Sequence, residues 1–245
     1  MPNYVKHKVT FAGNKKYITE MLESIRTDTD GSIRHIDFNK IIPMPESLNI
    51  TSGSETDIGV AILRHIEYND SELLNERLSY SWATQKNIKT LDDLVSYYRN
   101  NKNYEKVISL GRLAIDNIDK YGHQDWYGWA CENWGTKWNS GSTSMRETFL
   151  NIHEVLEFET AWSTPMPVML KLSENFPGIT FKVQYADEDI GSNCGEYILL
   201  NGKEISYLSY DGIKACEVWG YDPADYFPEI LRDRQIDKIL NDNKC

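Results

Sequence analysis

The sequence predicts an α+β fold made of two strand–helix–strand repeats with a long insertion between them. Three observations indicate this class. A strand pattern followed by a helix pattern opens the chain, the same order returns near residue 155, and mostly helical sequence separates the two. With 245 residues and 40% hydrophobic content, the chain suits one globular domain, so we predict a single domain over residues 1–245.

The N-terminal repeat is predicted within residues 4–38. Residues 4–12 alternate apolar and polar side chains, as a half-buried strand does. Apolar side chains at helical spacing over 17–25 predict an amphipathic helix. A turn then leads to a second expected strand at 33–38, and Pro43 and Pro45 prevent that strand from continuing.

An α-helical insertion is predicted over residues 46–121. From Ala61 onward, apolar side chains recur at spacings of three and four residues. Thr90 followed by Asp92 and Asp93 is typical of a capped helix start. The simplest interpretation is a helical part that only covers the sheet.

A second repeat and a hairpin complete the predicted fold. We expect a strand at 155–162, a helix at 168–175 and a strand at 181–185. The Asn-Gly pair at 201–202, between two strand-like segments, predicts a type I′ hairpin turn. Two split β-α-β halves form a ferredoxin-like sandwich, here with an extra C-terminal hairpin. Residues 209–245 then form an acidic C-terminal extension.

The charge is acidic and unevenly spread. The net charge is -11, and residues 187–245 hold thirteen acids and six bases, a balance of -7. Such a surface repels phosphate backbones, so we expect no direct nucleic-acid binding. It suits a partner with a basic surface, although solubility alone is the simpler explanation.

The sequence does not indicate a membrane protein or a protein that binds a metal or a cofactor. No apolar run is long enough to cross a bilayer, and the polar N-terminus lacks an apolar signal core, so we expect a cytoplasmic protein. The four cysteines form no CxxC pair, and we expect free thiols, no metal and no cofactor.

The tryptophan-rich segment is the main candidate site. Five of the seven tryptophans lie between residues 126 and 162. Gly135 would let a ligand approach the backbone, and Lys137 would place a cation beside aromatic planes. A buried aromatic core is the alternative. The predicted site comprises Trp126, Trp129, Asn133, Trp134, Gly135, Thr136, Lys137, Trp138 and Trp162.

Catalytic signals are weak. The sequence contains none of the common nucleophile-elbow, zinc-protease, P-loop or dinucleotide-binding motifs, and we do not expect an enzyme. Glu157 and Glu159 share one strand face and are weak candidates for an acid–base pair. The run Asp187, Glu188 and Asp189 predicts an exposed acidic patch.

Five segments also resemble a known family. They are residues 1–3 (MPN), 38–48 (FNKIIPMPESL), 133–139 (NWGTKWN), 158–165 (FETAWSTP) and 172–177 (LSENFP). In this order they resemble the YubB-like ferredoxin-like domain of phages and plasmids. The resemblance implies a ferredoxin-like fold without an iron–sulphur cluster, an origin in a mobile element, and a place in the host cytoplasm. It implies no particular activity.

Three functions therefore stay open. The first is a phage- or mobile-element-encoded accessory protein that binds a host protein and inhibits or sequesters it, as a counter-defence protein would. The second is a protein that binds or hydrolyses a small nucleotide-like molecule at the tryptophan-rich segment. The third is an acidic mimic of nucleic acid.

Overall fold

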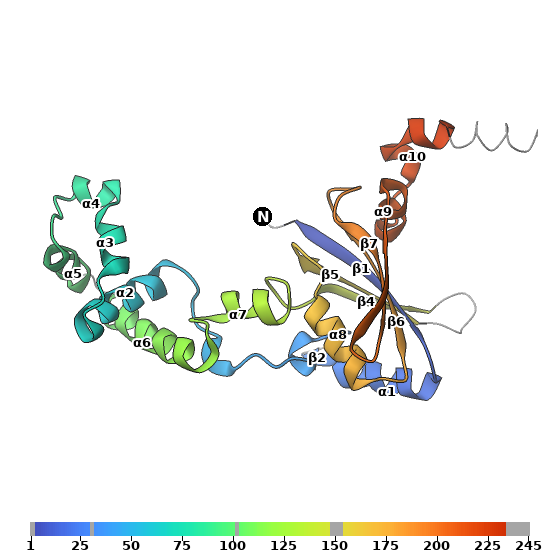
Figure 1. Ribbon diagram of the computed structural model, residues 1–245, viewed down its shortest axis with the longest axis horizontal. Coiled ribbons are helices and arrows are strands. Elements are labelled where there is room, and N and C mark those ends of the chain that lie inside the picture. Colours follow the sequence, from blue (N-terminus) through green and yellow to red (C-terminus); the bar gives the residue numbers. More distant parts are fainter. Residues whose placement is uncertain (1–2, 30–31, 101–102, 148–153, 234–245) are drawn as a thin grey trace, which may run out of the picture. The chain divides into compact units, whose positions relative to one another are not determined.

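The computed structural model describes residues 3–29, 32–100, 103–147 and 154–233 (Figure 1). The chain divides into two compact units. Unit 1 comprises residues 1–43 and 130–245, and unit 2 comprises residues 44–129. No helix in the described ranges is both long and apolar enough to cross a membrane.

Unit 1 is built on a six-stranded antiparallel sheet. Its strands are β1 (Tyr4–Ala12), β4 (Gly141–Glu147), β5 (Glu154–Ala161), β6 (Thr180–Asp187), β7 (Cys194–Leu200) and β8 (Lys203–Ser209). They lie in the order β4-β5-β1-β6-β7-β8, so the N-terminal strand is central (Figure 1). With α1 (Lys15–Ile25) after β1 and α8 (Met166–Asn175) after β5, the first four strands of this order have ferredoxin-like connectivity.

The second strand of this sheet differs from the predicted one. We expected it at 33–38, but β2 (Thr27–Thr29) and β3 (Ser32–Arg34) form a separate two-stranded sheet. Its place is taken by β4, a polar segment that pairs with β5. The prediction was wrong because pairing with a neighbouring strand, rather than a hydrophobic alternation, makes β4 a strand.

The core of unit 1 lies on one face of the sheet. In β1 the alternate residues Val5, His7, Val9 and Phe11 are buried, as the alternation predicted. The same face carries Phe158, which stacks on His7, and Phe181, which packs edge-to-face against Phe11. Helices α1 and α8 add further buried side chains, namely Met21, Leu22, Ile25, Val168, Met169 and Leu172.

The opposite face is partly covered by α9 (Gly212–Trp219). Ala186 points away from Val183 and Tyr185 along β6, and it packs against Ala215 and Val218 of this helix. The predicted hairpin turn is confirmed, because Asn201 and Gly202 both have positive φ, at 50° and 71°. After α10 (Pro223–Tyr226), the end of the predicted extension, 234–245, lies outside the described residues.

Unit 2 is helical. Its helices are α2 (Ser54–Tyr68), α3 (Glu72–Leu78), α4 (Ser81–Gln85), α5 (Leu91–Arg99) and α6 (Tyr104–Tyr121), with the short η2 (Glu46–Leu48) before them. The predicted helix start at Thr90 is confirmed, since Thr90 and Asp93 form a reciprocal capping box. A buried cluster that includes Ile62, Leu74 and Leu94 gives this unit its own core.

Candidate functional site

The tryptophan-rich segment is divided between the two units. Helix α7 (Trp126–Asn133) crosses their boundary, so Trp126 and Trp129 belong to unit 2 and the other predicted site residues to unit 1. Trp129 is buried, and Trp126 lies edge-to-face against Tyr127 with ring centroids 5.8 Å apart. These two indoles therefore belong to unit 2.

Two of the predicted site residues are core residues. Trp134 is 4% exposed, packs edge-to-face on Phe38 and donates its indole N–H to the Ile42 carbonyl at 2.9 Å. Thr136 is 2% exposed and donates its hydroxyl to the Ala161 carbonyl at 2.7 Å. Both polar groups are satisfied inside the protein, so the expectation that these side chains bind a ligand is corrected.

Gly135 also serves the packing of this segment. Its φ is +74°, and a Cβ built there would lie 2.8 Å from Cδ of Pro167. The Ser163 hydroxyl donates to the Gly135 carbonyl. Glycine is needed here because the loop passes close to the start of α8, and not, as we predicted, because a ligand approaches the backbone.

Three predicted residues do come together at the surface. The Lys137 ammonium lies 4.6 Å from the centroid of the Trp138 ring and 5.0 Å from that of Trp162. The two tryptophans are 38% and 41% exposed. We call this trio the indole–lysine surface. A cation held between two partly exposed indoles combines large contact area with a polar group.

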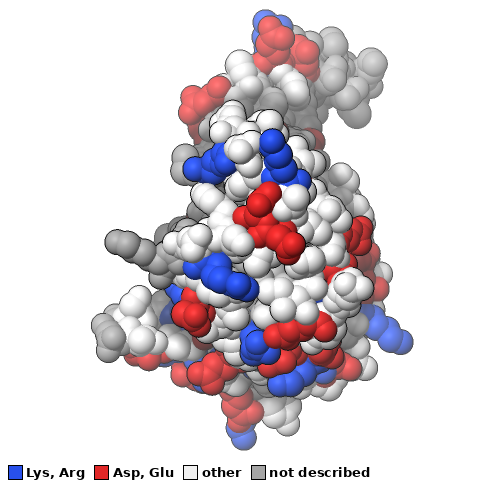
Figure 2. Space-filling model, turned by 90° about the vertical axis from the view of Figure 1, so that its left-hand side faces the viewer, with Lys and Arg blue, Asp and Glu red and all other residues white. Residues whose placement is uncertain are grey.

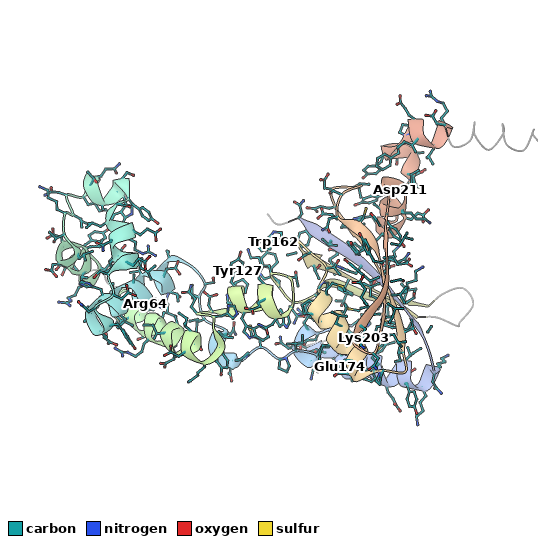
Figure 3. All side chains as sticks on the ribbon, in the orientation of Figure 1. Arg64, Tyr127, Trp162, Glu174, Lys203 and Asp211 are labelled. Carbon is teal, nitrogen blue, oxygen red and sulfur yellow. The ribbon has the colours of Figure 1, made fainter. Side chains whose placement is uncertain are left out.

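Trp162 has an unusual backbone. It follows the last residue of β5, at the end of the sheet where β1 begins (Figure 3), and its φ is +74°. Such a conformation is disfavoured for a bulky residue. Its N–H donates to the Asn3 carbonyl at 2.9 Å, and the Asn193 amide donates to its carbonyl at 3.4 Å. These bonds hold the backbone of Trp162 in this conformation against its cost.

The segment carrying Trp138 is also anchored. Asn139 donates its side-chain amide to Asp37 at 2.7 Å and accepts from the backbone N–H groups of Phe38 and Ser140. Partial burial alone would raise the pKa of Asp37, but hydrogen bonds, including those from Asn139 and Thr27, and nearby positive charge together outweigh burial and lower this pKa. Asn3, Asn139 and Asn193 were not predicted as site residues, because their partners are distant in sequence.

The predicted acidic patch is smaller than expected. Glu188 and Asp189 are exposed, but Asp187 is only 6% exposed. Its carboxylate accepts hydrogen bonds from the side chains of Asn3 and Asn193 and from the Asp189 N–H. Asp187 is therefore a buried acceptor that joins three segments, and its place in an exposed patch is corrected.

The two glutamates of β5 share a face, as predicted. Glu157 lies opposite Lys8 and Glu159 opposite Lys6 in the register with β1. Glu157 is 5% exposed, and its Oε2 lies 3.6 Å from the Lys6 ammonium. The Lys6 ammonium also lies 5.8 Å from the centroid of the Trp219 ring. A buried carboxylate paired in this way is a structural ion pair, which gives no support to general acid–base chemistry.

His7 is a buried titratable group of the core. It is fully buried, stacks on Phe158 at 4.6 Å and has Nε2 at 3.3 Å from the Thr164 hydroxyl. Burial lowers the pKa of His7 to about 3, an effect that backbone hydrogen bonds with Phe158 and Val5 only partly oppose. The imidazole is therefore neutral near pH 7.

The fold and site define an α+β, ferredoxin-like protein with an inserted helical unit. Comparison with known families agrees: residues 133–226 match the family described as the ferredoxin-like domain in Api92-like protein. A solved structure, the protein api92 from Yersinia pseudotuberculosis, is similar at 11% identity with a TM-score of 0.41, covering 86% of this chain and 98% of that chain. No curated protein matches the sequence.

Proposed function

We propose that this chain is a non-enzymatic binding protein that captures a protein partner on the indole–lysine surface. The observation that carries the proposal is the convergence of Trp138 and Trp162 on the Lys137 ammonium, at 4.6 and 5.0 Å, with both indoles about two-fifths exposed. Tryptophan is enriched in the residues that dominate protein–protein binding energy.

Rigid positioning supports this proposal. Each tryptophan lies beside a residue fixed by hydrogen bonds, Asn139 next to Trp138 and Ser163 next to Trp162. Binding then costs less conformational entropy, since the segments that carry the two tryptophans are already anchored. The strained φ of Trp162 fits a residue kept at the surface for contact rather than for stability.

A basic partner fits the charge. The net charge of -11 favours encounter with a positively charged surface. The resemblance to the YubB-like domains of phages and plasmids suggests that this partner is a host protein. Inhibition or sequestration of that protein in a counter-defence role is the function that we propose.

A nucleotide-like ligand is the second candidate. Two indoles could stack on a base while a lysine pairs with a phosphate, and all three groups are present on one surface. Titration with ATP, GTP and NAD while tryptophan fluorescence is recorded tests this idea. A saturable change in wild type that Lys137→Gln weakens would favour it over a protein partner.

The test of the main proposal is capture from bacterial lysate with quantitative mass spectrometry. The full chain is compared with the variant Trp138→Ala/Trp162→Ala. We expect a protein retained by wild type to be depleted at least about tenfold with the double variant, because hot-spot tryptophans are each worth about 2 kcal/mol or more.

The control is Tyr226→Ala, which removes another exposed aromatic ring of unit 1 that is 47% exposed. This variant should retain the partner as wild type does. Equal recovery with the double variant, or equal loss with the control, would show that the indole–lysine surface is not the binding site.

A further inference from the structure

Unit 2 contains a polar groove that is independent of the indole–lysine surface. It has a volume of about 290 Å³ and lies between α2, α3, the start of α4 and the chain after α6. Its charged and polar lining consists of Asp57, Glu76, Arg77, Tyr80 and Gln124, while Val60 and Leu73 provide apolar surface. On the face drawn in Figure 2, basic and acidic side chains are intermixed.

Arg77 supplies the cation of the groove. Its side chain is 19% exposed, and its Nη2 lies 4.0 Å from Asp57 Oδ2, which is beyond hydrogen-bond distance. Its charge also acts on Tyr98, whose pKa is raised by burial and lowered in part by Arg77. A guanidinium has five N–H donors, so donors remain for a bidentate contact with an incoming carboxylate.

Two carboxylates face the same space. Glu76 accepts a hydrogen bond from the Tyr80 hydroxyl through Oε1 at 2.7 Å. Asp57 accepts one from the Gln124 amide through Oδ1 at 2.8 Å. Each carboxylate is therefore oriented through one oxygen, and a carboxylate can accept about four hydrogen bonds in total. Both retain capacity to bind an ammonium group.

We infer that this groove binds a small zwitterion of the α-amino acid class. The ligand's carboxylate pairs with Arg77, and its ammonium group pairs with Glu76 and Asp57. Val60 and Leu73 contact the aliphatic part of its side chain. The groove's volume of about 290 Å³ is large enough to admit an amino acid of medium size.

The charge pattern sets the selectivity. A ligand that carries only carboxylates meets repulsion from Asp57 and Glu76, and a ligand that carries only amines supplies no partner for Arg77. A zwitterion brings a carboxylate for Arg77 and an ammonium group for Asp57 and Glu76. The groove therefore discriminates by charge arrangement as well as by size.

Isothermal titration calorimetry of the full chain with four compounds tests the inference. L-glutamine and L-arginine carry the zwitterion, whereas succinate carries only carboxylates and putrescine only amines. We expect at least one amino acid to bind about tenfold or more tightly than both controls. Binding of neither amino acid at millimolar concentration, or equal binding of a control compound, overturns the inference.

Variants locate the site. Arg77→Gln and Glu76→Gln should each weaken binding about tenfold or more, because each removes a charge-assisted pair. Glu72→Gln, an exposed change on the same helix outside the groove, should have no effect. Circular dichroism verifies that the variants fold, and should Arg77→Gln not fold, Glu76→Gln gives the result.

Amino-acid binding in the groove can be tested separately from partner binding on the indole–lysine surface. Trp138→Ala/Trp162→Ala should bind the amino acid as wild type does, since these residues belong to unit 1. If Arg77→Gln and Glu76→Gln bind as wild type does, the ligand lies elsewhere and the inference is wrong.

Discussion

Trp162 combines an unusual backbone conformation with a place in the proposed binding surface. A bulky side chain at φ +74° opposes its own backbone preference, and hydrogen bonds from Trp162 to Asn3 and from Asn193 to Trp162 maintain the conformation. Neither the left-handed φ nor these partners follow from a sequence pattern, because they arise only when three distant segments meet at one end of the sheet.

Two substitutions at Trp162 measure the free-energy cost of its positive φ. Trp162→Gly and Trp162→Ala both remove the indole, but only glycine adopts this φ without a steric penalty. We expect the glycine variant to have a free energy of unfolding about 1 kcal/mol higher than the alanine variant. Urea denaturation measures this difference, and equal values would contradict a strained backbone.

His7 gives a prediction about pH. Its folded-state pKa of about 3 lies below its unfolded value of 6.5, so the unfolded chain binds more protons between these values. The stabilisation is complete above about pH 6.5 and falls by roughly 1.4 kcal/mol per unit as pH decreases toward 3.

The measurement is the free energy of unfolding from pH 7.5 to pH 5 for wild type and for His7→Leu. Wild type should lose roughly 2 kcal/mol more than the variant over this range, because leucine does not titrate. Parallel pH profiles would show that His7 is not buried in its neutral form.

The candidate site was predictable only in part at the residue scale. The predicted site contained Lys137, Trp138 and Trp162, whose side chains lie together in the structure. The sequence pattern could not separate them from Trp134 and Thr136, which are buried. Residues 134–140 form neither a helix nor a strand, so no periodicity indicates which side chains face inward.

At the scale of elements, the sequence predicted those helices and strands that have a strong local pattern. It did not predict the strand that forms by pairing with a neighbour. The alternation of β1, the amphipathic α1 and the Asn-Gly turn between β7 and β8 all appear where expected. Strand β4 was missed because Gly141–Glu147 is a polar segment that becomes a strand by pairing with β5. Its position in the sheet depends on its pairing partners in β5, which the polar segment itself does not indicate.

The contact between α2 and α6 depends on two glycines. A Cβ at Gly111 would lie 2.3 Å from the carbonyl carbon of Gly59, with no space to move. Gly111→Ala should therefore lower the free energy of unfolding of unit 2 by about 1–3 kcal/mol, despite the higher helix propensity of alanine.

Urea denaturation followed through helical circular dichroism measures this effect. Ser109→Ala, an exposed change on the same helix, should stay within about 0.5 kcal/mol of wild type. A Gly111→Ala variant as stable as wild type would mean that the two helices do not approach so closely.

On the scale of the whole molecule, each unit has its own set of elements. All six strands of the large sheet lie within residues 4–12 and 141–209, while the buried cluster of unit 2 lies within 61–95. We predicted the helical insertion over 46–121, and the compact unit extends over 44–129. The change from strand to helix patterns predicted an insertion at this place, but as part of a single domain over residues 1–245 and not as a separate compact unit.

This organisation predicts that unit 1 folds without unit 2. Replacing residues 44–129 by a flexible glycine–serine linker removes no strand of the large sheet. The shortened protein should give a dispersed amide NMR spectrum and near-ultraviolet circular dichroism typical of packed aromatic residues. An amide NMR spectrum with little dispersion would show that unit 1 requires the helical unit to fold.

The most direct measurement of partner binding is hydroxyl-radical footprinting of the full chain, free and with its captured partner. Trp138 and Trp162 are about two-fifths exposed in the free protein and should oxidise readily, whereas Trp134 should not. With the partner bound, oxidation of Trp138 and Trp162 should fall severalfold and that of Tyr226 should not change. Unchanged oxidation of both tryptophans in the complex would contradict a binding role for the indole–lysine surface.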